Sequence, residues 1–188
     1  GFQPSVLVRT EAMPILQLRV DDVNGDAKSD LIATSGGTDA LFGKSGGFVV
    51  LLMGTATPTA SYAYAAADRV ISVTSGDYNR DGKVDIAAVS ADSKLSVLFG
   101  SGDGKFPTGR AVAITSPSPQ LVSVDWNKDG KVDLVMGGKP DGSTVSWAGW
   151  FLQGAGDGTF AAQSSIKPVR LSFTSMAVAD VDADGKLN

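Results

Sequence analysis

Residues 77–89 read DYNRDGKVDIAAV, and this stretch carries the pattern on which the whole chain is built. Its first nine residues place oxygen-bearing side chains at positions 1, 3, 5 and 9 and a glycine at position 6. Asp and Asn followed by Gly are typical of a tight loop. The apolar run that begins at position 10 favours a buried strand. The stretch therefore predicts a loop that leads into a β-strand.

The same loop occurs four times in the chain of 188 residues. The first positions of the four copies are separated by 55, 48 and 55 residues, and a period near fifty is typical of a repeat architecture. Strand-like segments precede and follow the loops, so each loop is expected to be the turn of a β-hairpin. A third strand that ends in glycine (Phe48–Gly54, Leu95–Gly100 and Val145–Gly154) and a more polar fourth strand complete the unit. Four strands at this period match one blade of a β-propeller.

The predicted fold class is therefore all-β, with blades of four antiparallel strands. Three complete blades are expected with partial blades at both ends, as in a fragment of a longer propeller or an open array. Residues 1–188 form one repeat segment, with units at 1–15 (partial), 16–69, 70–119, 120–174 and 175–188 (partial). The composition agrees, because 23 glycines and the lack of helix-type stretches disfavour helices.

The four loops are candidate metal sites. Three carboxylates within nine residues repel one another unless a cation lies among them, and hard divalent ions prefer oxygen ligands. Positions 1, 3, 5 and 9 are Asp22, Asn24, Asp26 and Asp30 in loop 1, Asp77, Asn79, Asp81 and Asp85 in loop 2, Asp125, Asn127, Asp129 and Asp133 in loop 3, and Asp180, Asp182, Asp184 and Asn188 in loop 4. The net charge is −4 and twelve of the twenty acidic residues lie in these loops. The acidity is therefore local, and calcium is the predicted ion.

Composition excludes several other classes of site. The chain has no Cys and no His, which removes disulfides, thiol chemistry, the commonest general base and the usual zinc ligands. The apolar run at Phe48–Met53 is far too short to span a bilayer. The acidic balance does not indicate nucleic acid. We expect no nucleic-acid partner and no membrane insertion.

The motifs resemble the FG-GAP repeat family, also called VCBS-type repeats. The resemblance rests on DDVNGDAKSDLIA (21–33), GDYNRDGKVDIAAV (76–89), VDWNKDGKVDLVM (124–136) and ADVDADGKLN (179–188), together with LFGSGDGKF (98–106) and FLQGAGDGTF (151–160). Such repeats form the β-propeller of integrin α subunits and occur in bacterial secreted proteins and some lectins. The resemblance implies that each loop binds Ca²⁺ through positions 1, 3, 5 and 9 and through the backbone carbonyl of position 7. Position 7 is Lys28, Lys83, Lys131 and Lys186, and three to four ions are expected in all.

Two loops depart from the pattern. Position 6 of loop 1 is Ala27, where a positive φ is costly for a residue with a Cβ. Loop 1 is expected either to bind the ion more weakly or to have a different backbone. Loop 4 carries Asn188 at position 9, so it is the weakest of the predicted sites.

Three other interpretations of the loops fit the sequence less well. Turn chemistry alone explains the Asp, Asn and Gly cluster, but a turn does not need an acid at position 9. An EF-hand needs a bidentate Glu at position 12 and flanking helices, whereas position 12 is Ala33, Ala88 and Met136 between strand-like segments. Magnesium prefers octahedral geometry with several retained waters. Calcium fits four side chains and a carbonyl better.

The sequence predicts a binding protein and not an enzyme. Carboxylates engaged with calcium are held ionised and are poor proton donors, and Asp103 and Asp157 recur at equivalent turn positions. We expect a calcium-binding extracellular scaffold, secreted or at the cell surface, for adhesion or for binding a protein or glycan ligand. The alternatives are a carbohydrate-binding lectin propeller, a structural subunit of a repeat assembly, and an accessory domain of a secreted enzyme. Self-association that completes the propeller stays open.

Overall fold

The computed structural model describes residues 15–35, 48–53, 58–64, 70–114, 120–138 and 147–169. These ranges contain twelve β-strands and no helix, which confirms the predicted all-β class. Accordingly, the described segments include no helix that could cross a membrane. The partial units predicted at 1–15 and 175–188 lie outside the described residues, apart from Ile15.

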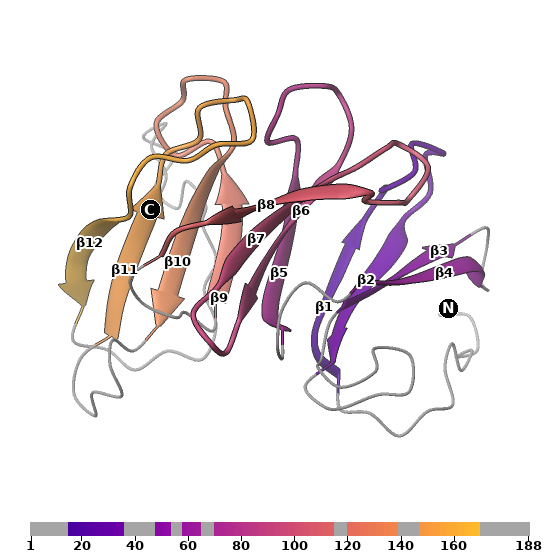
Figure 1. Ribbon diagram of the computed structural model, residues 1–188, viewed down its shortest axis with the longest axis horizontal. Helices are drawn as coiled ribbons and strands as arrows, with labels where there is room; N and C mark the ends of the chain where they lie inside the picture. Colours follow the sequence, from indigo (N-terminus) through magenta and orange to yellow (C-terminus); the bar gives the residue numbers. More distant parts are fainter. Residues whose placement is uncertain are drawn as a thin grey trace, which may run out of the picture.

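The strands form three four-stranded antiparallel sheets, shown side by side in Figure 1. Each sheet follows chain order, so each is a simple meander. Blade 1 contains β1 (Ile15–Asp21), β2 (Asp30–Ser35), β3 (Phe48–Met53) and β4 (Pro58–Tyr64). Blade 2 contains β5 (Val70–Gly76), β6 (Asp85–Ser90), β7 (Leu95–Phe99) and β8 (Thr108–Val112). Blade 3 contains β9 (Gln120–Val124), β10 (Asp133–Gly138), β11 (Trp147–Leu152) and β12 (Ser164–Val169).

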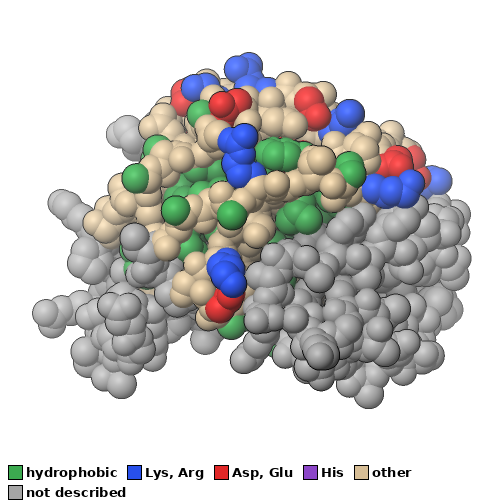
Figure 2. Space-filling model, in the orientation of Figure 1, with side chains coloured by type: hydrophobic (Ala, Val, Ile, Leu, Met, Phe, Trp, Pro, Cys, Tyr) green, Lys and Arg blue, Asp and Glu red, His purple; other side chains and the backbone are tan. Residues whose placement is uncertain are grey.

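Each predicted loop joins the first two strands of its blade. The register pairs Asp21 with Asp30 in blade 1, Gly76 with Asp85 in blade 2, and Val124 with Asp133 in blade 3. The residue before position 1 thus lies opposite position 9 in all three hairpins. The loops and their flanking charges lie along one edge of the three sheets, at the top of Figures 1 and 2.

The hydrophobic core lies between the blades. Because side chains alternate along a strand, the sheet of blade 2 packs one face against blade 1 and the other against blade 3. Blades 1 and 2 meet through Val23, Ile32, Val70, Val73, Ile86, Ala88 and Phe106. Blades 2 and 3 meet through Tyr78, Ala87, Val89, Leu95, Val97, Leu121, Leu134, Met136, Trp150 and Leu152. Strands β6 and β10, which contribute to these clusters, are buried along their whole length.

The first strands of the three blades lie next to one another, since β5 contacts both β1 and β9. Polar side chains connect them. The backbone N–H of Val73 donates to Gln17 Oε1 at 2.6 Å, and Ser75 Oγ donates to Asp21 Oδ2 at 2.5 Å. The N–H of Ser123 donates to Thr74 Oγ1 at 3.2 Å. Apolar packing and polar contacts therefore act together at both blade interfaces.

Candidate metal loops

Loops 1, 2 and 3 (22–30, 77–85 and 125–133) share one set of hydrogen bonds. The backbone N–H of position 5 donates to one side-chain oxygen of position 1 and to the side-chain oxygen of position 3. The N–H of position 6 donates to the second carboxylate oxygen of position 1, and the N–H of position 7 donates to a carboxylate oxygen of position 5. The donor–acceptor distances are 3.1, 3.1, 2.8 and 2.9 Å in loop 1, 3.1, 3.0, 2.9 and 2.9 Å in loop 2, and 3.0, 3.0, 2.9 and 2.9 Å in loop 3. Backbone donors thus orient the three side chains predicted to bind an ion. Loop 4 lies outside the described residues.

The loops also share their backbone conformation. Position 6 has φ of 63° at Ala27, 81° at Gly82 and 78° at Gly130. The expectation that loop 1 has a different backbone is therefore wrong: Ala27 adopts the left-handed conformation despite its Cβ, and its N–H still donates to Asp22. An L-residue in this region carries a strain of about 1 kcal/mol. Weaker ion binding by loop 1 stays a prediction.

Position 9 has a role in the fold that sequence reasoning missed. Asp30, Asp85 and Asp133 are fully buried, and one oxygen of each accepts the N–H of position 2 at 3.0 Å. In blades 2 and 3 the other oxygen accepts the N–H of Gly100 at 2.9 Å or Gly154 at 2.8 Å, just beyond the third strand. The expectation that these turns do not need an acid at position 9 is wrong, because this carboxylate ties the loop to a distant strand.

The acids within a loop differ in environment. Burial raises the pKa of Asp85, although the hydrogen bonds from Gly100 and Tyr78 oppose the rise. Partial desolvation acts in the same direction on Asp129, but hydrogen bonds from Asn127, Lys131 and Gln153 outweigh it and lower the pKa of Asp129. Position 5 is thus an exposed carboxylate in all three loops, whereas position 9 is a buried acceptor.

Lysine at position 7 places a cation near position 5. Lys28 Nζ lies 3.7 Å from Asp26 Oδ2, and Lys131 Nζ lies 3.8 Å from Asp129 Oδ2. Over the ranges that the structure covers, no three acidic side chains converge as a ready-made metal site. The predicted ligands are therefore oriented by the backbone, but in the described loops they do not converge on one point.

The comparison with known families gives a direct match. The FG-GAP-like repeat family matches the chain three times, over residues 22–88, 77–136 and 125–188. The matches overlap at the loops and cover most of the sequence. The chain belongs to the FG-GAP repeat family. The comparison with curated proteins yields no match.

The glycine-rich turn of an FG-GAP unit packs on the loop of the preceding blade. In blade 3 this turn is 154–159, and the N–H of Gly158 donates to the carbonyl of Tyr78, position 2 of loop 2, at 2.9 Å. A Cβ at Gly158 would lie 2.4 Å from the ring of Phe99, so only glycine allows this approach. Phe160 follows the turn and packs edge-on against Tyr78, with ring centroids 5.7 Å apart. Loop 2 is thus part of the interface with blade 3.

Two of the described loops carry an aromatic residue at position 2, Tyr78 in loop 2 and Trp126 in loop 3. Tyr78 is buried, its hydroxyl lies 2.6 Å from Ser123 Oγ, and burial raises its pKa. Trp126 is half-buried against Phe151, with ring centroids 6.5 Å apart. Both rings therefore serve contacts within the fold.

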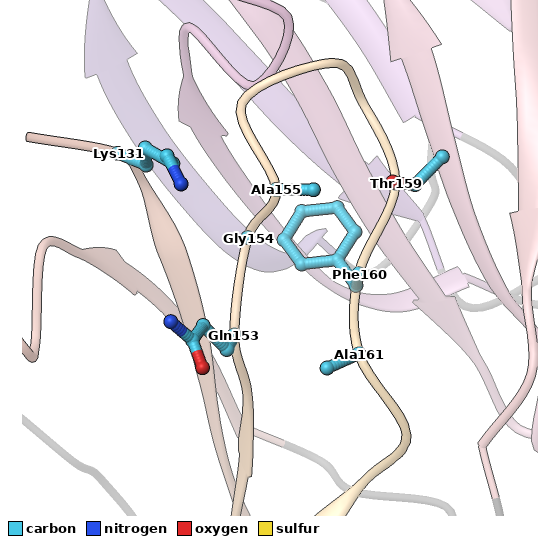
Figure 3. Close-up of a pocket in the computed structure, with 7 residues that line it drawn as sticks. All are labelled: Lys131, Gln153, Gly154, Ala155, Thr159, Phe160 and Ala161. Atoms are coloured by element: carbon cyan, nitrogen blue, oxygen red, sulfur yellow. The ribbon is translucent and has the colours of Figure 1, made fainter. Parts of the chain in front are cut away.

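A shallow hollow of about 350 Å³ lies beside loop 3 (Figure 3). It is lined by Lys131, Gln153, Gly154, Ala155, Thr159, Phe160 and Ala161. In Figure 3 the Phe160 ring stands between the two limbs of the turn, while Lys131 and Gln153 form the opposite side. The hollow combines one aromatic ring with an amine, an amide and a hydroxyl.

Acids outside the loops bond to nearby groups wherever the structure describes them. Asp21 accepts the hydroxyl of Ser75, and Asp92 accepts that of Ser90. Asp103 accepts Ser101 Oγ and Lys105 Nζ, and Asp157 accepts the N–H and hydroxyl of Thr159. Glu11, Asp39, Asp68 and Asp141 lie outside the described residues. The described acids cap turns or join blades.

Proposed function

We propose that this FG-GAP chain is a calcium-binding scaffold that acts outside the cell or at its surface by binding a protein ligand. The observation that carries the proposal is the hydrogen-bond set common to loops 1, 2 and 3. Three separate segments hold Asp, Asn and Asp in the same orientation, although other residues of the loops differ. A common geometry for oxygen ligands supports one common ligand.

The side chains fit calcium by their chemistry. All candidate donors are oxygens, three of the four at each described loop are carboxylates, and calcium takes six to eight oxygen ligands. Positions 1, 3, 5 and 9 and the carbonyl of position 7 would hold the ion. A carboxylate offers about four lone-pair sites, so the backbone hydrogen bonds leave capacity for a metal. The bound ion would supply positive charge that offsets the repulsion among the carboxylates.

The loop composition also supports an extracellular location. The loops are exposed except at positions 2 and 9 and partly at their ends, and a lysine competes for position 5 in loops 1 and 3. Both features favour modest affinity, and extracellular calcium modules bind with dissociation constants of about 10⁻⁴–10⁻³ M. Ion binding that closes the loops would add to the stability of the folded state.

The proposal includes no catalysis. The described acids outside the loops bond to hydroxyl, amide or ammonium groups, and a substrate would have to displace these partners. The ligand is expected at the loop edge, where the charged side chains gather in Figure 2. Loops held by a rigid scaffold are the usual place for binding residues.

The decisive test compares one substitution at two positions of loop 3. Asp129→Asn keeps an acceptor for the Lys131 N–H but removes a charge at position 5. Asp133→Asn removes one of two acceptor oxygens at a buried site, leaving the N–H of Trp126 or Gly154 unpaired at a cost of about 1–3 kcal/mol. Because Asn127 and Gln153 also donate to Asp129 Oδ2, Asp129→Asn should lower the melting temperature slightly in chelator and clearly more in calcium. Asp133→Asn should already lower it strongly in chelator, because its hydrogen bonds are buried.

Calorimetric titration of chelator-stripped protein completes the test. We expect calcium to bind at several sites, to raise the melting temperature, and to lose one site in Asp129→Asn. A loss of stability in Asp129→Asn that is equal with and without calcium would assign the loop to turn formation and overturn the proposal.

A carbohydrate ligand is the second candidate, and the hollow beside loop 3 favours it. Phe160 offers an aromatic surface, and Gln153, Thr159 and Lys131 offer hydrogen-bonding groups around it. A glycan array separates the two candidates. Binding that Gln153→Ala abolishes would support a carbohydrate site, and an array without binding would leave the protein ligand.

A further inference from the structure

One glycine-rich turn of blade 3 contacts two of the candidate metal loops. This turn is 154–159, and we call it the bridging turn. The N–H of Gly154 donates to Asp133 Oδ1 of loop 3 at 2.8 Å. The N–H of Gly158 donates to the carbonyl of Tyr78 in loop 2 at 2.9 Å. The bridging turn therefore joins a candidate loop of blade 2 to one of blade 3.

The bridging turn is closed on itself and closely fitted between the two loops. The N–H of Ala155 donates to the carbonyl of Thr159 at 2.9 Å, which fixes the spacing of the two outer contacts. A Cβ at Gly156 would lie 2.9 Å from Arg80 Cδ and 3.2 Å from Lys131 Cδ. Arg80 is position 4 of loop 2, and Lys131 is position 7 of loop 3. Gly156 thus lies directly against side chains of both loops.

Both outer contacts lead to the carboxylate at position 9. In loop 3 the contact is direct, because Gly154 bonds to Asp133 itself. In loop 2 it passes through Tyr78, whose carbonyl accepts the N–H of Gly158 and whose own N–H donates to Asp85 Oδ2 at 3.0 Å. Asp85 and Asp133 are both fully buried, and both are predicted ion ligands. A continuous path of hydrogen bonds and short backbone segments therefore connects a predicted ligand of loop 2 to one of loop 3.

The equivalent turn of blade 2 lacks the side-chain contact from the preceding loop. Gly102 corresponds to Gly156, and the three atoms nearest to a Cβ there all belong to Lys83 of loop 2, at 3.3–3.6 Å. Position 4 of loop 1 is Gly25, which has no side chain to reach this turn. Among the described blades, contact with a position 4 side chain is thus particular to loops 2 and 3.

We propose that the bridging turn couples loops 2 and 3, so that an ion bound in one loop raises the affinity of the other. The inference rests on the proposed function, because it needs calcium in both loops. Asp85 held by an ion would in turn hold Tyr78 and the bridging turn. Gly154 would then keep Asp133 in place, so loop 3 loses less conformational freedom when it binds its own ion. Such coupling is reciprocal, so loop 3 assists loop 2 by the same factor.

Terbium luminescence of chelator-stripped protein measures loop 3 by itself. Tb³⁺ binds oxygen ligands as Ca²⁺ does and emits when a nearby tryptophan is excited, and Trp126 is position 2 of loop 3. Trp126→Phe should abolish the signal and so assigns it to this loop. We expect Asp81→Asn, which removes a predicted ligand from loop 2, to weaken Tb³⁺ binding at loop 3 about fivefold or more. Asp26→Asn makes the same change in loop 1, and as the matched control it should leave the affinity of loop 3 unchanged.

Gly158→Ala tests whether the bridging turn carries the coupling. Its Cβ would lie 2.4 Å from the ring of Phe99 and so push the turn away from loop 2. In this background Asp81→Asn should no longer change the affinity of loop 3, and this double-mutant cycle cancels the direct effect of the lost charge. Gly102→Ala is the control, because φ is 82° there and 78° at Gly158, and it should leave the coupling intact. Circular dichroism checks that each variant folds.

Amide hydrogen exchange followed by NMR gives a second readout that leaves the bridging turn unchanged. In Asp129→Asn, calcium should still slow the exchange of the Gly154 N–H, which bonds to Asp133 of the altered loop. Adding Asp81→Asn should cancel this protection.

Three results would overturn the coupling while calcium binding stands. They are a loop 3 affinity that does not depend on loop 2, coupling that survives in folded Gly158→Ala, and a Gly154 N–H that calcium does not protect in Asp129→Asn. A protein that binds neither Ca²⁺ nor Tb³⁺ would overturn the proposed function and the coupling together.

Discussion

Arg19 donates a hydrogen bond from Nη2 to the backbone carbonyl of Leu121, 102 residues further along the chain, at 3.0 Å. Its Nε donates to the carbonyl of Val73 at 3.3 Å. One side chain of blade 1 thus reaches the first strands of blades 2 and 3. The rigid, planar guanidinium suits this role, because it presents several donors in fixed directions.

Replacing Arg19 with Met should therefore destabilise the protein. The change keeps an unbranched side chain but removes both hydrogen-bond donors. A hydrogen bond from a charged group contributes about 1.5–3 kcal/mol to stability, and solvent reduces this contribution because both bonds are only partly buried. We expect a loss of about 1–3 kcal/mol in the free energy of unfolding, measured by urea denaturation. Arg19→Lys keeps the positive charge but lacks the planar set of donors. Its free energy of unfolding should lie between those of the unchanged protein and Arg19→Met. Unchanged stability in Arg19→Met would mean that the contact contributes nothing.

Ala27→Gly should stabilise the protein by about 0.5 kcal/mol, because the relief of about 1–2 kcal/mol of left-handed strain outweighs about 0.5–1 kcal/mol of added unfolded-chain entropy. The substitution relieves the left-handed strain at φ 63° and keeps the N–H that bonds to Asp22. Ala111→Gly in the extended strand β8 is the control and should destabilise, because glycine there adds only chain entropy to the unfolded state. Thermal melting distinguishes the two signs. If loop 1 binds calcium weakly because of this strain, Ala27→Gly should also raise its affinity.

Thr34→Val should be stabilising by about 1 kcal/mol. The Thr34 hydroxyl is buried without a hydrogen-bond partner, so it is desolvated without compensation. The equivalent position in blade 2 is Val89, which shows that the fold accepts valine there. Thr74→Val is the matched control: Thr74 Oγ1 accepts the N–H of Ser123, and its loss should cost stability. The same sign for both changes in chemical denaturation would contradict this explanation.

Asp103 should titrate well below an ordinary aspartate. Hydrogen bonds from Lys105 and Ser101 lower its pKa to about 2 from the reference value of 3.8. Because the folded pKa is depressed, the stabilising contribution is present above pH 3.8 and is lost as the pH falls toward 2. Carboxyl NMR shifts followed against pH measure this directly. In Lys105→Met the pKa should rise toward 3.8, and an unchanged value would remove Lys105 as the cause.

The repeat spacing was enough to predict the hairpins, because the loop and its apolar flanks recur in register. The ends of the third strands were less well predicted. They were expected to run to Gly100 and Gly154, whereas β7 ends at Phe99 and β11 at Leu152. The N–H of Gly100 bonds to the acid at position 9 instead of a strand partner. In blade 3, pairing stops at Leu152 and returns only as an isolated bridge between Gly154 and Phe160. The boundaries between the repeat units stay predictions.

The sequence was enough to predict which residues form the candidate site, but not which distant residues they contact. The residue types at positions 1, 3 and 5 indicate oxygen ligands from sequence alone. The second role of Asp85 depends on Gly100, fifteen residues away, and the contact between Gly158 and Tyr78 depends on how two blades approach each other. Local patterns carry no information about such distances. The glycine that follows the third strand is the one feature of the sequence that indicates these long-range contacts.

Several polar contacts between adjacent blades use a main-chain atom on one side. Arg19 bonds to carbonyls, the N–H of Val73 meets Gln17, and the N–H of Gly158 meets the carbonyl of Tyr78. A carbonyl or an amide is present whatever side chain a mutation installs. At these contacts the residue that supplies the main-chain atom can therefore change its side chain without losing the polar contact, so one side of a duplicated interface is able to diverge before the other.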